Sequence, residues 1–315
     1  MKIVHISDLH INTEFKRENN EKANRILEYI VDSGFDHLII SGDITENADR
    51  NSMEYARKLL KKFNLLDADK LTVVIGNHDI FGGVNYAEDV IQFPKKCKNI
   101  SYEDKVSQFE YYFRESFNNT FQPDKNNIFP FAKELGGILL VGINTIANYS
   151  LFNNPFASNG LVNKEQFNNI EKILNSNAFS NKTKIVIAHH HFIKNHNDCS
   201  VDSSIWKRIE KQTMKLRNKR KLLKLFSTYD VKTVLHGHLH ESNEYNRKGI
   251  NFFNAGGATL GYKSELKINY INIISNEASF EMKSIPSCSM VEKSSHQISK
   301  YKHTPKLIKA EICLN

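Results

Sequence analysis

Cysteine is scarce in this sequence, and its four copies lie far apart. Cys97, Cys199, Cys288 and Cys313 form no Cys-x-x-Cys pair, so their spacing indicates neither a zinc knuckle nor a disulfide framework. Long apolar runs are also missing, since none approaches the ~20 residues that a membrane-spanning helix needs. The N-terminus enters a strand-like run at once, without the basic region, apolar core or cleavage site of a signal peptide. We therefore expect a cytoplasmic protein.

The composition is that of an ordinary globular protein, but its positive charge is concentrated in one place. The 315 residues are 40% hydrophobic and 25% charged, and the net charge is +8. Residues 205–226 carry nine lysines and arginines against the single acid Glu210, so this segment alone accounts for the net charge. A localised basic face attracts phosphate groups more strongly than a diffuse excess of charge does.

Apolar residues within 205–226 recur at helical spacing, which predicts an amphipathic helix. They are Ile205, Ile209, Leu216, Leu223 and Phe226. We favour a helix that covers a sheet and leaves its cations in solvent. The alternative is a weak contact of the basic face with nucleic acid or an anionic membrane.

Strand-like and helix-like segments alternate along most of the chain. We expect strands near residues 2–7, 37–41, 71–75, 137–143, 184–188, 231–235, 250–254, 267–274 and 278–282, and helices near 24–31, 52–63 and 164–174. This alternation is typical of an α/β fold, in which sites form where strand ends meet loops.

Residues 81–137 interrupt the alternation with an aromatic, helix-like segment near 107–117 and an Asn-rich loop. We expect an insertion here, either a cap over a substrate or a packing helix with a surface loop. From residue 284 the chain becomes polar and loses its periodicity. We therefore predict one domain over 1–283 and a basic polar C-terminal tail over 284–315.

Side chains that can bind metal ions follow five of the expected strands. They are Asp8, His10, Asp43, Asn77, His78, His189, His238 and His240. Imidazole nitrogen mixed with carboxylate and amide oxygen suits Mn, Fe or Zn. Two ions about 3.5–4 Å apart lower the pKa of a shared water and clamp the oxygens of an in-line displacement. We therefore expect a dinuclear phosphoesterase, in which a metal-bridging hydroxide attacks a small phosphorylated substrate.

The same residues form five blocks in a fixed order. The blocks are Asp8-x-His10, Gly42-Asp43, Gly76-Asn77-His78-Asp79, His189 and Gly237-His238-x-His240. From residue 8 to residue 240 the chain thereby resembles the calcineurin-like metallophosphoesterase family. The resemblance implies the metallo-dependent phosphatase fold, a four-layer α/β/β/α sandwich with two mixed β-sheets.

The resemblance also implies a role for each block. The implied ligands of one ion are Asp8, His10, Asp43 and His240, and those of the other are Asp43, Asn77, His189 and His238. Asp43 would then bridge the two ions. His78 would donate to the phosphate or to the leaving oxygen, with Asp79 orienting its ring.

The fourth block departs from the family's pattern. Many relatives read His-His-Pro there, whereas this chain reads His189-His190-His191-Phe192 without a proline. We assign the ligand to His189 because it comes first after the strand, and His190 is the alternative. For His191 and His236 we expect packing or surface roles.

Residues 216–222 and 234–240 resemble the cyclic-nucleotide phosphodiesterase branch of the family. This resemblance implies a phosphodiester substrate, such as a 3',5'-cyclic nucleotide, rather than a monoester. One alternative is a peripheral-membrane pyrophosphatase acting on a UDP-linked lipid. Another is a metal-poor scaffold on the same fold, against which the complete set of ligand residues argues. The sequence does not indicate the oligomeric state.

Overall fold

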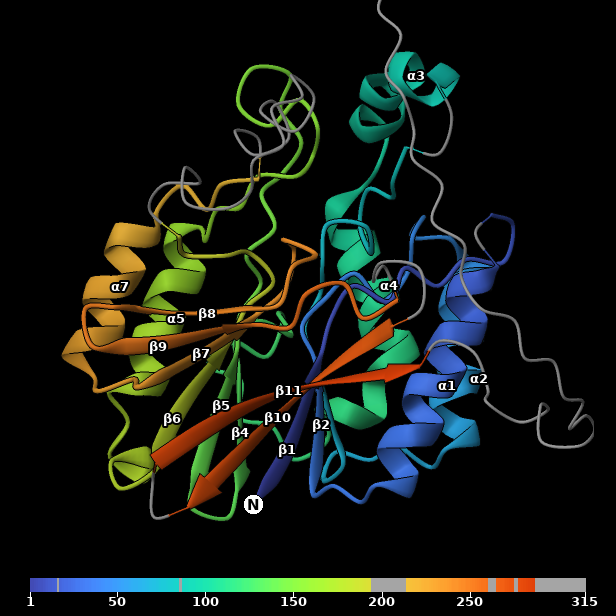
Figure 1. Ribbon diagram of the computed structural model, residues 1–315. Helices are drawn as coiled ribbons and strands as arrows, with labels where there is room; N and C mark the ends of the chain where they lie inside the picture. Colours follow the sequence, from blue (N-terminus) through green and yellow to red (C-terminus); the bar gives the residue numbers. More distant parts are fainter. Residues whose placement is uncertain (16, 85–86, 194–213, 260–264, 275–276, 287–315) are drawn as a thin grey trace, which may run out of the picture.

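The computed structural model describes residues 1–15, 17–84, 87–193, 214–259, 265–274 and 277–286. Its strands form two mixed β-sheets with helices outside them (Figure 1). The predicted α/β architecture with two mixed sheets is confirmed.

The first sheet has five strands in the order β11-β10-β1-β2-β3. The strands β1, β2 and β3 are parallel, while β10 runs antiparallel to β1 and β11 antiparallel to β10. Their bounds are β1 Lys2–Ile6, β2 His37–Ile40, β3 Leu71–Val73, β10 Glu265–Ile274 and β11 Glu277–Pro286.

The second sheet has six strands in the order β4-β5-β6-β7-β9-β8. Its four central strands are parallel, and the edge strands β4 and β8 run antiparallel to their neighbours. Their bounds are β4 Phe131–Leu135, β5 Ile138–Gly142, β6 Thr183–Ile187, β7 Thr233–His236, β8 Asn243–Arg247 and β9 Ile250–Asn254.

Alternate residues of the second sheet point into two different cores, because successive side chains of a strand face opposite sides. Leu140 of β5 and Ile187 of β6 join the central core, which also holds the buried residues of β1, β2 and β3. Leu139 and Val186, their neighbours in sequence, join the outer core together with helices α5 and α7. The central core therefore lies between the two sheets, and the outer core covers the other face of the second sheet.

Each helix buries one apolar face against these cores. Their bounds are α1 Glu18–Asp32, α2 Arg50–Lys62, α3 Ala87–Lys98, α4 Tyr102–Phe113, α5 Lys164–Leu174 and α7 Lys219–Thr228, with short 3-10 turns η1 Arg114–Phe117 and η2 Asn177–Phe179. The expected helix over 164–174 is confirmed, and α5 begins where the Asn163 side chain accepts a hydrogen bond from Gln166 N. Such a cap satisfies an otherwise unpaired backbone donor at the helix start.

Residues 81–137 contain more regular structure than we expected. They form the two helices α3 and α4, where we expected one. The helix α4 starts five residues before the predicted 107, because the Ser101 side chain caps it by accepting from Asp104 N. They also contain β4, which pairs with β5 along its whole length. The end of this segment is thus an edge strand of the second sheet.

We predicted a single helix over 205–226, and this prediction is wrong for the described part of the segment. Residues 214–218 are not helical, since Leu216 bridges to Gly160 and the Asn218 side chain donates to Val162 O at 2.6 Å. The helix α7 begins only at Lys219 and runs on to Thr228. Its Leu222, Leu223 and Phe226 are buried in the outer core. Residues 205–213 lie outside the described residues.

The predicted tail begins inside a strand, because β11 continues to Pro286. Residues 287–315 lie outside the described residues. Among the helices that the structure describes, none is both long and apolar enough to cross a membrane.

Candidate metal centre

The predicted ligands come together at the carboxyl ends of the parallel strands. Asp8 and His10 follow β1, Asp43 follows β2, and the 76–79 block follows β3. From the second sheet, His189 follows β6 and the 237–240 block follows β7. Parallel strands deliver their carboxyl ends to one edge, which is where α/β sheets form their sites.

The loops that hold these residues have unusual backbone conformations. Five of the side chains extend from residues with positive φ, namely Asp8, His10, Asp43, His238 and His240. Such values are uncommon for residues other than glycine and cluster at functional sites. Close contact adds to this constraint, since a Cβ on Gly76 would lie 2.1 Å from Asp43 Oδ1. The block therefore requires glycine at that position.

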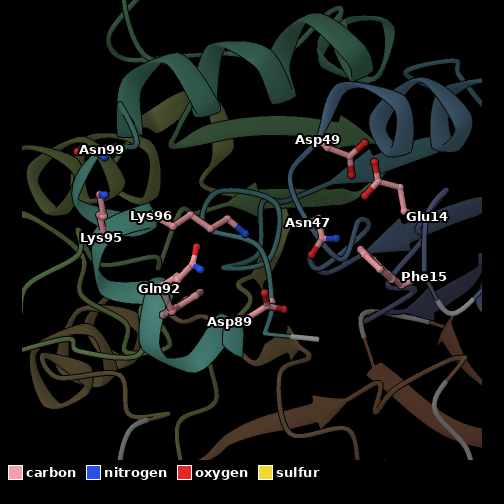
Figure 2. Close-up of a pocket in the computed structure, with 11 residues that line it drawn as sticks. Glu14, Phe15, Asn47, Asp49, Asp89, Gln92, Lys95, Lys96 and Asn99 are labelled. Atoms are coloured by element: carbon pink, nitrogen blue, oxygen red, sulfur yellow. The ribbon is translucent and has the colours of Figure 1, made fainter. Parts of the chain in front are cut away.

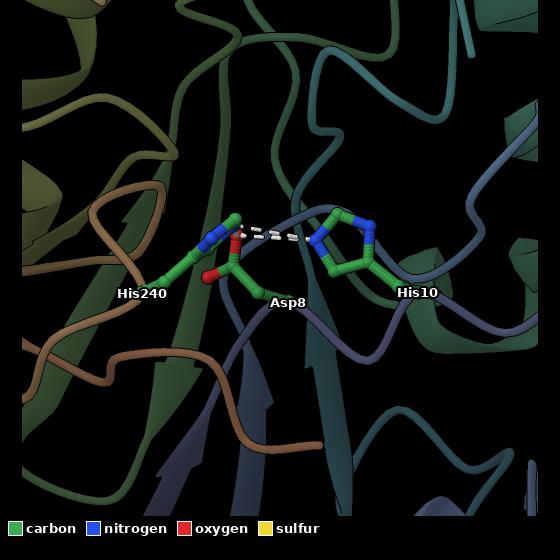
Figure 3. Close-up of side chains that lie close together, drawn as sticks. All are labelled: Asp8, His10 and His240. Carbon is green, nitrogen blue, oxygen red and sulfur yellow. Dashed lines mark hydrogen bonds and ion pairs between the residues drawn. The ribbon is translucent and has the colours of Figure 1, made fainter. Parts of the chain in front are cut away.

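Asp8, His10 and His240 form the first group of candidate ligands (Figure 3). Asp8 Oδ1 lies 3.4 Å from His240 Nε2 and 3.9 Å from His10 Nε2. The two imidazole Nε2 atoms are 3.4 Å apart. Asp8 is fully buried, yet its Oδ1 has no hydrogen-bond partner. The three side chains thus converge on one point with an unsatisfied oxygen among them.

Asp43, His189 and His238 form the second group. His189 Nε2 lies 3.2 Å from Asp43 Oδ2 and 3.0 Å from His238 Nδ1. Asn77 Oδ1 lies 3.1 Å from the same His189 nitrogen. His238 is also buried, and its Nε2 has no hydrogen-bond partner.

Electrostatics within the second group are those of a site that needs a cation. His189 Nδ1 faces the Ser41 carbonyl at 2.8 Å, and because a carbonyl only accepts, Nδ1 carries the proton. In the neutral ring, Nε2 then turns a lone pair toward the oxygens of Asp43 and Asn77. Burial acts to lower the pKa of His189, but the charge of Asp43 outweighs it and raises the pKa to about 9. The repulsion between these three acceptor atoms is removed when a proton or a metal ion binds among them.

The pKa values of the two carboxylates, Asp43 and Asp8, are shifted downward. Burial acts to raise the pKa of Asp43, but the neighbouring His189 and His78 hold it well below the ordinary value. Burial likewise opposes ionisation of Asp8, and the contact with His240 nevertheless lowers its pKa. Both groups therefore offer charged oxygens, as metal ligands must.

Glu46 is a site residue that the sequence reasoning missed. Its Oε2 lies 2.6 Å from His10 Nδ1 and 3.7 Å from His78 Nδ1, and the three residues form a third group. Its position three residues after Asp43, in the same loop, was the available signal. A carboxylate on the far nitrogen of a ligand histidine fixes the ring and its tautomer.

The expected role of Asp79 in orienting the His78 ring is wrong. The Asp79 carboxylate accepts hydrogen bonds from the backbone of Ile44, Thr45 and Gly76 and from the Thr45 hydroxyl. It therefore ties the loop after β2 to the loop after β3. The His78 ring is held instead by Glu46, whose carbonyl oxygen lies 3.1 Å from Nδ1.

The remaining histidines near the site have other partners. His190 contacts the Thr145 hydroxyl through Nδ1 and the Ser158 carbonyl through Nε2, so both of its ring nitrogens are occupied. Burial lowers its pKa to about 3. His191 Nδ1 accepts from Ile193 N, and His236 Nε2 lies 2.8 Å from the Tyr245 hydroxyl. These contacts favour His189 over His190 as the ligand that follows β6.

The donor set fits a pair of borderline metal ions. Each of the first two groups has three ligand atoms within 4.8 Å of one another. Both groups mix imidazole nitrogen with carboxylate oxygen, and in both a buried polar atom lacks a hydrogen-bond partner. Buried polar atoms are nearly always satisfied. Six in the described residues have no partner, and two of these six, Asp8 Oδ1 and His238 Nε2, belong to the two ligand groups, where a bound cation would satisfy them.

Comparisons with known proteins agree with this geometry. A family model described as calcineurin-like phosphoesterase matches residues 1–242. A protein of Ruthia magnifica subsp. Calyptogena magnifica named "probable cyclic nucleotide phosphodiesterase" is 24% identical over 272 residues, which are 85% of this chain and 90% of the relative. A protein of Coxiella burnetii with the same description is 27% identical over 250 residues, or 78% of this chain and 77% of the relative.

Two solved structures share the fold at low sequence identity. A dimetal phosphatase from Danio rerio matches with a TM-score of 0.52 and 10% identity, over 91% of this chain and 99% of that one. A purple acid phosphatase from yellow lupin seeds matches with a TM-score of 0.53 and 13% identity, over 91% of this chain and 51% of that one. These likenesses identify the metallo-phosphatase fold.

Proposed function

Because the chain belongs to the calcineurin-like phosphoesterase family, we propose that it hydrolyses a phosphodiester with the help of two metal ions. The observation that carries this proposal is the pair of ligand groups in which imidazole nitrogens and carboxylate oxygens converge and one buried atom of each group has no hydrogen-bond partner. Mn, Fe and Zn are the ions that this mixture of nitrogen and oxygen donors suits. When bound, the ions would activate water and stabilise negative charge on the phosphoryl oxygens.

In this proposal the two groups hold one ion each. Asp8, His10, Asp43 and His240 would hold the first, and Asp43, Asn77, His189 and His238 would hold the second. Asp43 would thus be a ligand of both ions. Asp43 also lies near the first group. Burial acts to lower the pKa of His10, but the contact with Glu46 and the charge of Asp43 together raise it.

His78 is proposed as the residue that contacts the phosphate or the leaving oxygen. Its backbone N–H donates to Asp43 Oδ1 at 2.8 Å, which positions it beside the bridge. Its side chain is 22% exposed, unlike the fully buried His189 and Asp8. Since Nδ1 donates to the Glu46 carbonyl, Nε2 is the atom left to face a substrate, and it donates only when the ring is protonated.

A 3',5'-cyclic nucleotide is the proposed substrate class. It is supported by the names of the two curated relatives, each of which aligns over more than three quarters of this chain. The proposal also places the protein in the cytoplasm.

Metal analysis and a substrate panel test this function together. Protein incubated with Mn should hold about two equivalents of metal and should hydrolyse 3',5'-cyclic AMP or cyclic GMP in preference to p-nitrophenyl phosphate, a monoester. Bis(p-nitrophenyl) phosphate serves as a general diester. Less than one equivalent of metal, with no hydrolysis of any diester, would favour a scaffold and refute the proposal.

A further inference from the structure

The loop between β5 and α5 exposes a group of large apolar side chains. Leu151, Phe152, Phe156 and Leu161 are all exposed, and the exposed fraction of Phe152 reaches 92%. The other exposed apolar side chains are spread over the rest of the described chain. A single exposed apolar residue is ordinary, whereas a group of neighbours marks a contact with a protein or a membrane. We call residues 148–161 the apolar loop.

Polar side chains occupy the inside of the apolar loop, which is the reverse of an ordinary core. Asn154 is buried, and its Nδ2 donates to Ala147 O at 3.2 Å, while its Oδ1 accepts from Asn159 N at 2.9 Å. The backbone N–H of Asn154 also donates to Ser150 O at 2.7 Å. These hydrogen bonds fix the backbone of the loop. Its apolar side chains are therefore held outward by a defined structure.

Cations lie directly against the apolar loop. Gly160 N donates to Lys215 O at 3.0 Å, and Arg217 N donates to Gly160 O at 2.9 Å. The Arg217 guanidinium also donates to Asn153 O, and both Lys215 and Arg217 are exposed. Residues 214–228 contain six lysines and arginines and no acid, and the apolar loop itself has no charged residue. The apolar side chains therefore have positive charge beside them.

The charge of this surface acts on its own members. Burial lowers the pKa of Lys219 to about 8, and the nearby cations Arg247, Lys215 and Arg220 contribute to the shift in the same direction. A surface on which cations repel one another attracts anions. An anionic partner is therefore favoured at this position.

The small area of the apolar loop favours a membrane over a protein partner or a second copy. A large side chain covers roughly 150–250 Å², so Leu151, Phe152 and Phe156 together expose at most roughly 500 Å². Each partner of a stable protein interface buries more, about 800 Å². A bilayer needs only a shallow insertion of a few apolar side chains, strengthened by cations that attract anionic headgroups.

The helix α3 provides a contrast at the same end of the molecule (Figure 1). Its Ile91 is 84% exposed. A pocket of about 580 Å³ beside α3, however, is lined by charges of both signs, among them Asp49, Lys95 and Lys96 (Figure 2). An anionic surface is both attracted and repelled by such a mixture. Ile91 therefore supplies a matched control for the apolar loop.

We propose that the apolar loop docks on the surface of an anionic phospholipid bilayer. Phe152 and its apolar neighbours enter the headgroup region, and Lys215 and Arg217 bind lipid phosphates. The loop starts after β5, at the edge of the sheet where the metal ligands lie, and Thr145 at its base contacts His190 at 2.9 Å. Docking therefore turns the end of the molecule that holds the metal centre toward the bilayer.

Vesicle binding tests this docking without use of the enzymatic activity. The protein should co-sediment with vesicles of equal parts phosphatidylcholine and phosphatidylglycerol, more than with phosphatidylcholine alone, and salt should weaken binding because it screens the cations. Phe152→Ser should lower the partition coefficient roughly tenfold or more, since it removes a large apolar side chain. Arg217→Gln should lower it roughly fivefold on the anionic vesicles only. Ile91→Ser should leave it unchanged.

A tryptophan probe reports insertion directly. The fluorescence of Phe152→Trp, measured above that of the native Trp206, should be quenched by brominated phosphatidylcholine in anionic vesicles. Because Phe152 and Ile91 are exposed, these variants should fold like the wild type, which their thermal unfolding midpoints check.

Three results would overturn the membrane assignment. The first is absence of binding to anionic vesicles, or an unquenched probe. The second is an equal loss of binding in Phe152→Ser and Ile91→Ser. The third is a dimer, seen by analytical ultracentrifugation, that Phe152→Ser dissociates and vesicles do not, which would assign the loop to a second copy. The phosphoesterase proposal stands under each result, because the metal centre takes no part in these assays.

Discussion

Glu46 Oε2 lies 2.6 Å from His10 Nδ1, and this contact turns His10 Nε2 toward Asp8 and His240. Both members of the pair are almost fully buried. Glu46 also holds His78 through its backbone carbonyl. One residue of the loop after β2 therefore orients both a candidate metal ligand and the candidate proton donor.

Replacing Glu46 should weaken binding of one of the two ions. We expect Glu46→Ala to lower metal affinity by about 10–100-fold, because the His10 ring loses the partner that fixes its tautomer. Titration with Mn, followed by metal analysis after dialysis, measures this loss. Glu54→Ala is the matched control, since Glu54 lies on the exposed face of α2 in an ion pair with Lys58. Equal affinities in the two variants would show that Glu46 does not support the centre.

His78→Ala should reduce turnover and leave the metal content intact. Loss of a general acid typically costs about 10²–10⁴-fold in rate. An acid acts only when protonated, so the contribution of His78 declines as pH rises through its pKa, which burial lowers. The kcat of the variant should therefore approach that of the wild type at alkaline pH. Loss of metal from the variant would instead identify His78 as a ligand.

Asp43→Ala should abolish turnover. This carboxylate contacts His189, accepts from His78 N and is the proposed bridge. We expect activity to fall by a factor on the order of 10³ or more, because removing one residue from a set that acts together in catalysis costs about as much as removing all of them. Activity on bis(p-nitrophenyl) phosphate and the number of bound ions measure the effect. A variant that keeps two ions and most of its activity would exclude Asp43 as the bridge.

Asp79→Asn should act mainly on stability. The carboxylate accepts four hydrogen bonds that tie two loops together, and an amide can replace only part of them. We expect the free energy of unfolding to fall by about 2 kcal/mol, measured by urea denaturation. If Asp79 oriented His78 instead, the substitution would lower kcat at unchanged stability.

The pair of Arg57 and Glu115 should give a pH-dependent contribution to stability. Arg57 binds both carboxylate oxygens of Glu115, with Nη1 2.7 Å from Oε2, and it lowers the pKa of Glu115 to about 2. An acid whose pKa is depressed by folding stabilises the protein above its unfolded pKa, near 4.5, and loses that contribution as pH falls toward 2.

Both side chains are partly exposed, so we expect Glu115→Gln to cost about 1 kcal/mol at pH 7. The difference in unfolding free energy between wild type and variant should shrink between pH 4.5 and pH 2. A difference that stayed constant over this range would show that the charge of Glu115 contributes nothing.

The family, the two-sheet architecture and most of the strands could be predicted from the sequence. Apolar runs mark buried strands such as β2 and β9, and polar residues directly after a strand must emerge at its carboxyl edge. Helix limits were predictable where a local signal is strong, as at Asn163 before α5. They were not where a contact distant in sequence decides, as when the bridge from Leu216 to Gly160 keeps residues 214–218 out of the helix.

The sequence by itself determined which side chains can bind metal ions and that they lie at strand ends, because residue chemistry and strand periodicity are local properties. Only the tertiary structure decided which neighbours support these residues. Glu46 reaches His10 across 36 positions of the chain, and Asp79 binds a loop 34 and 35 positions away. Such partners are chosen by the packing of β1, β2 and β3 side by side, a relation that no short stretch of sequence contains.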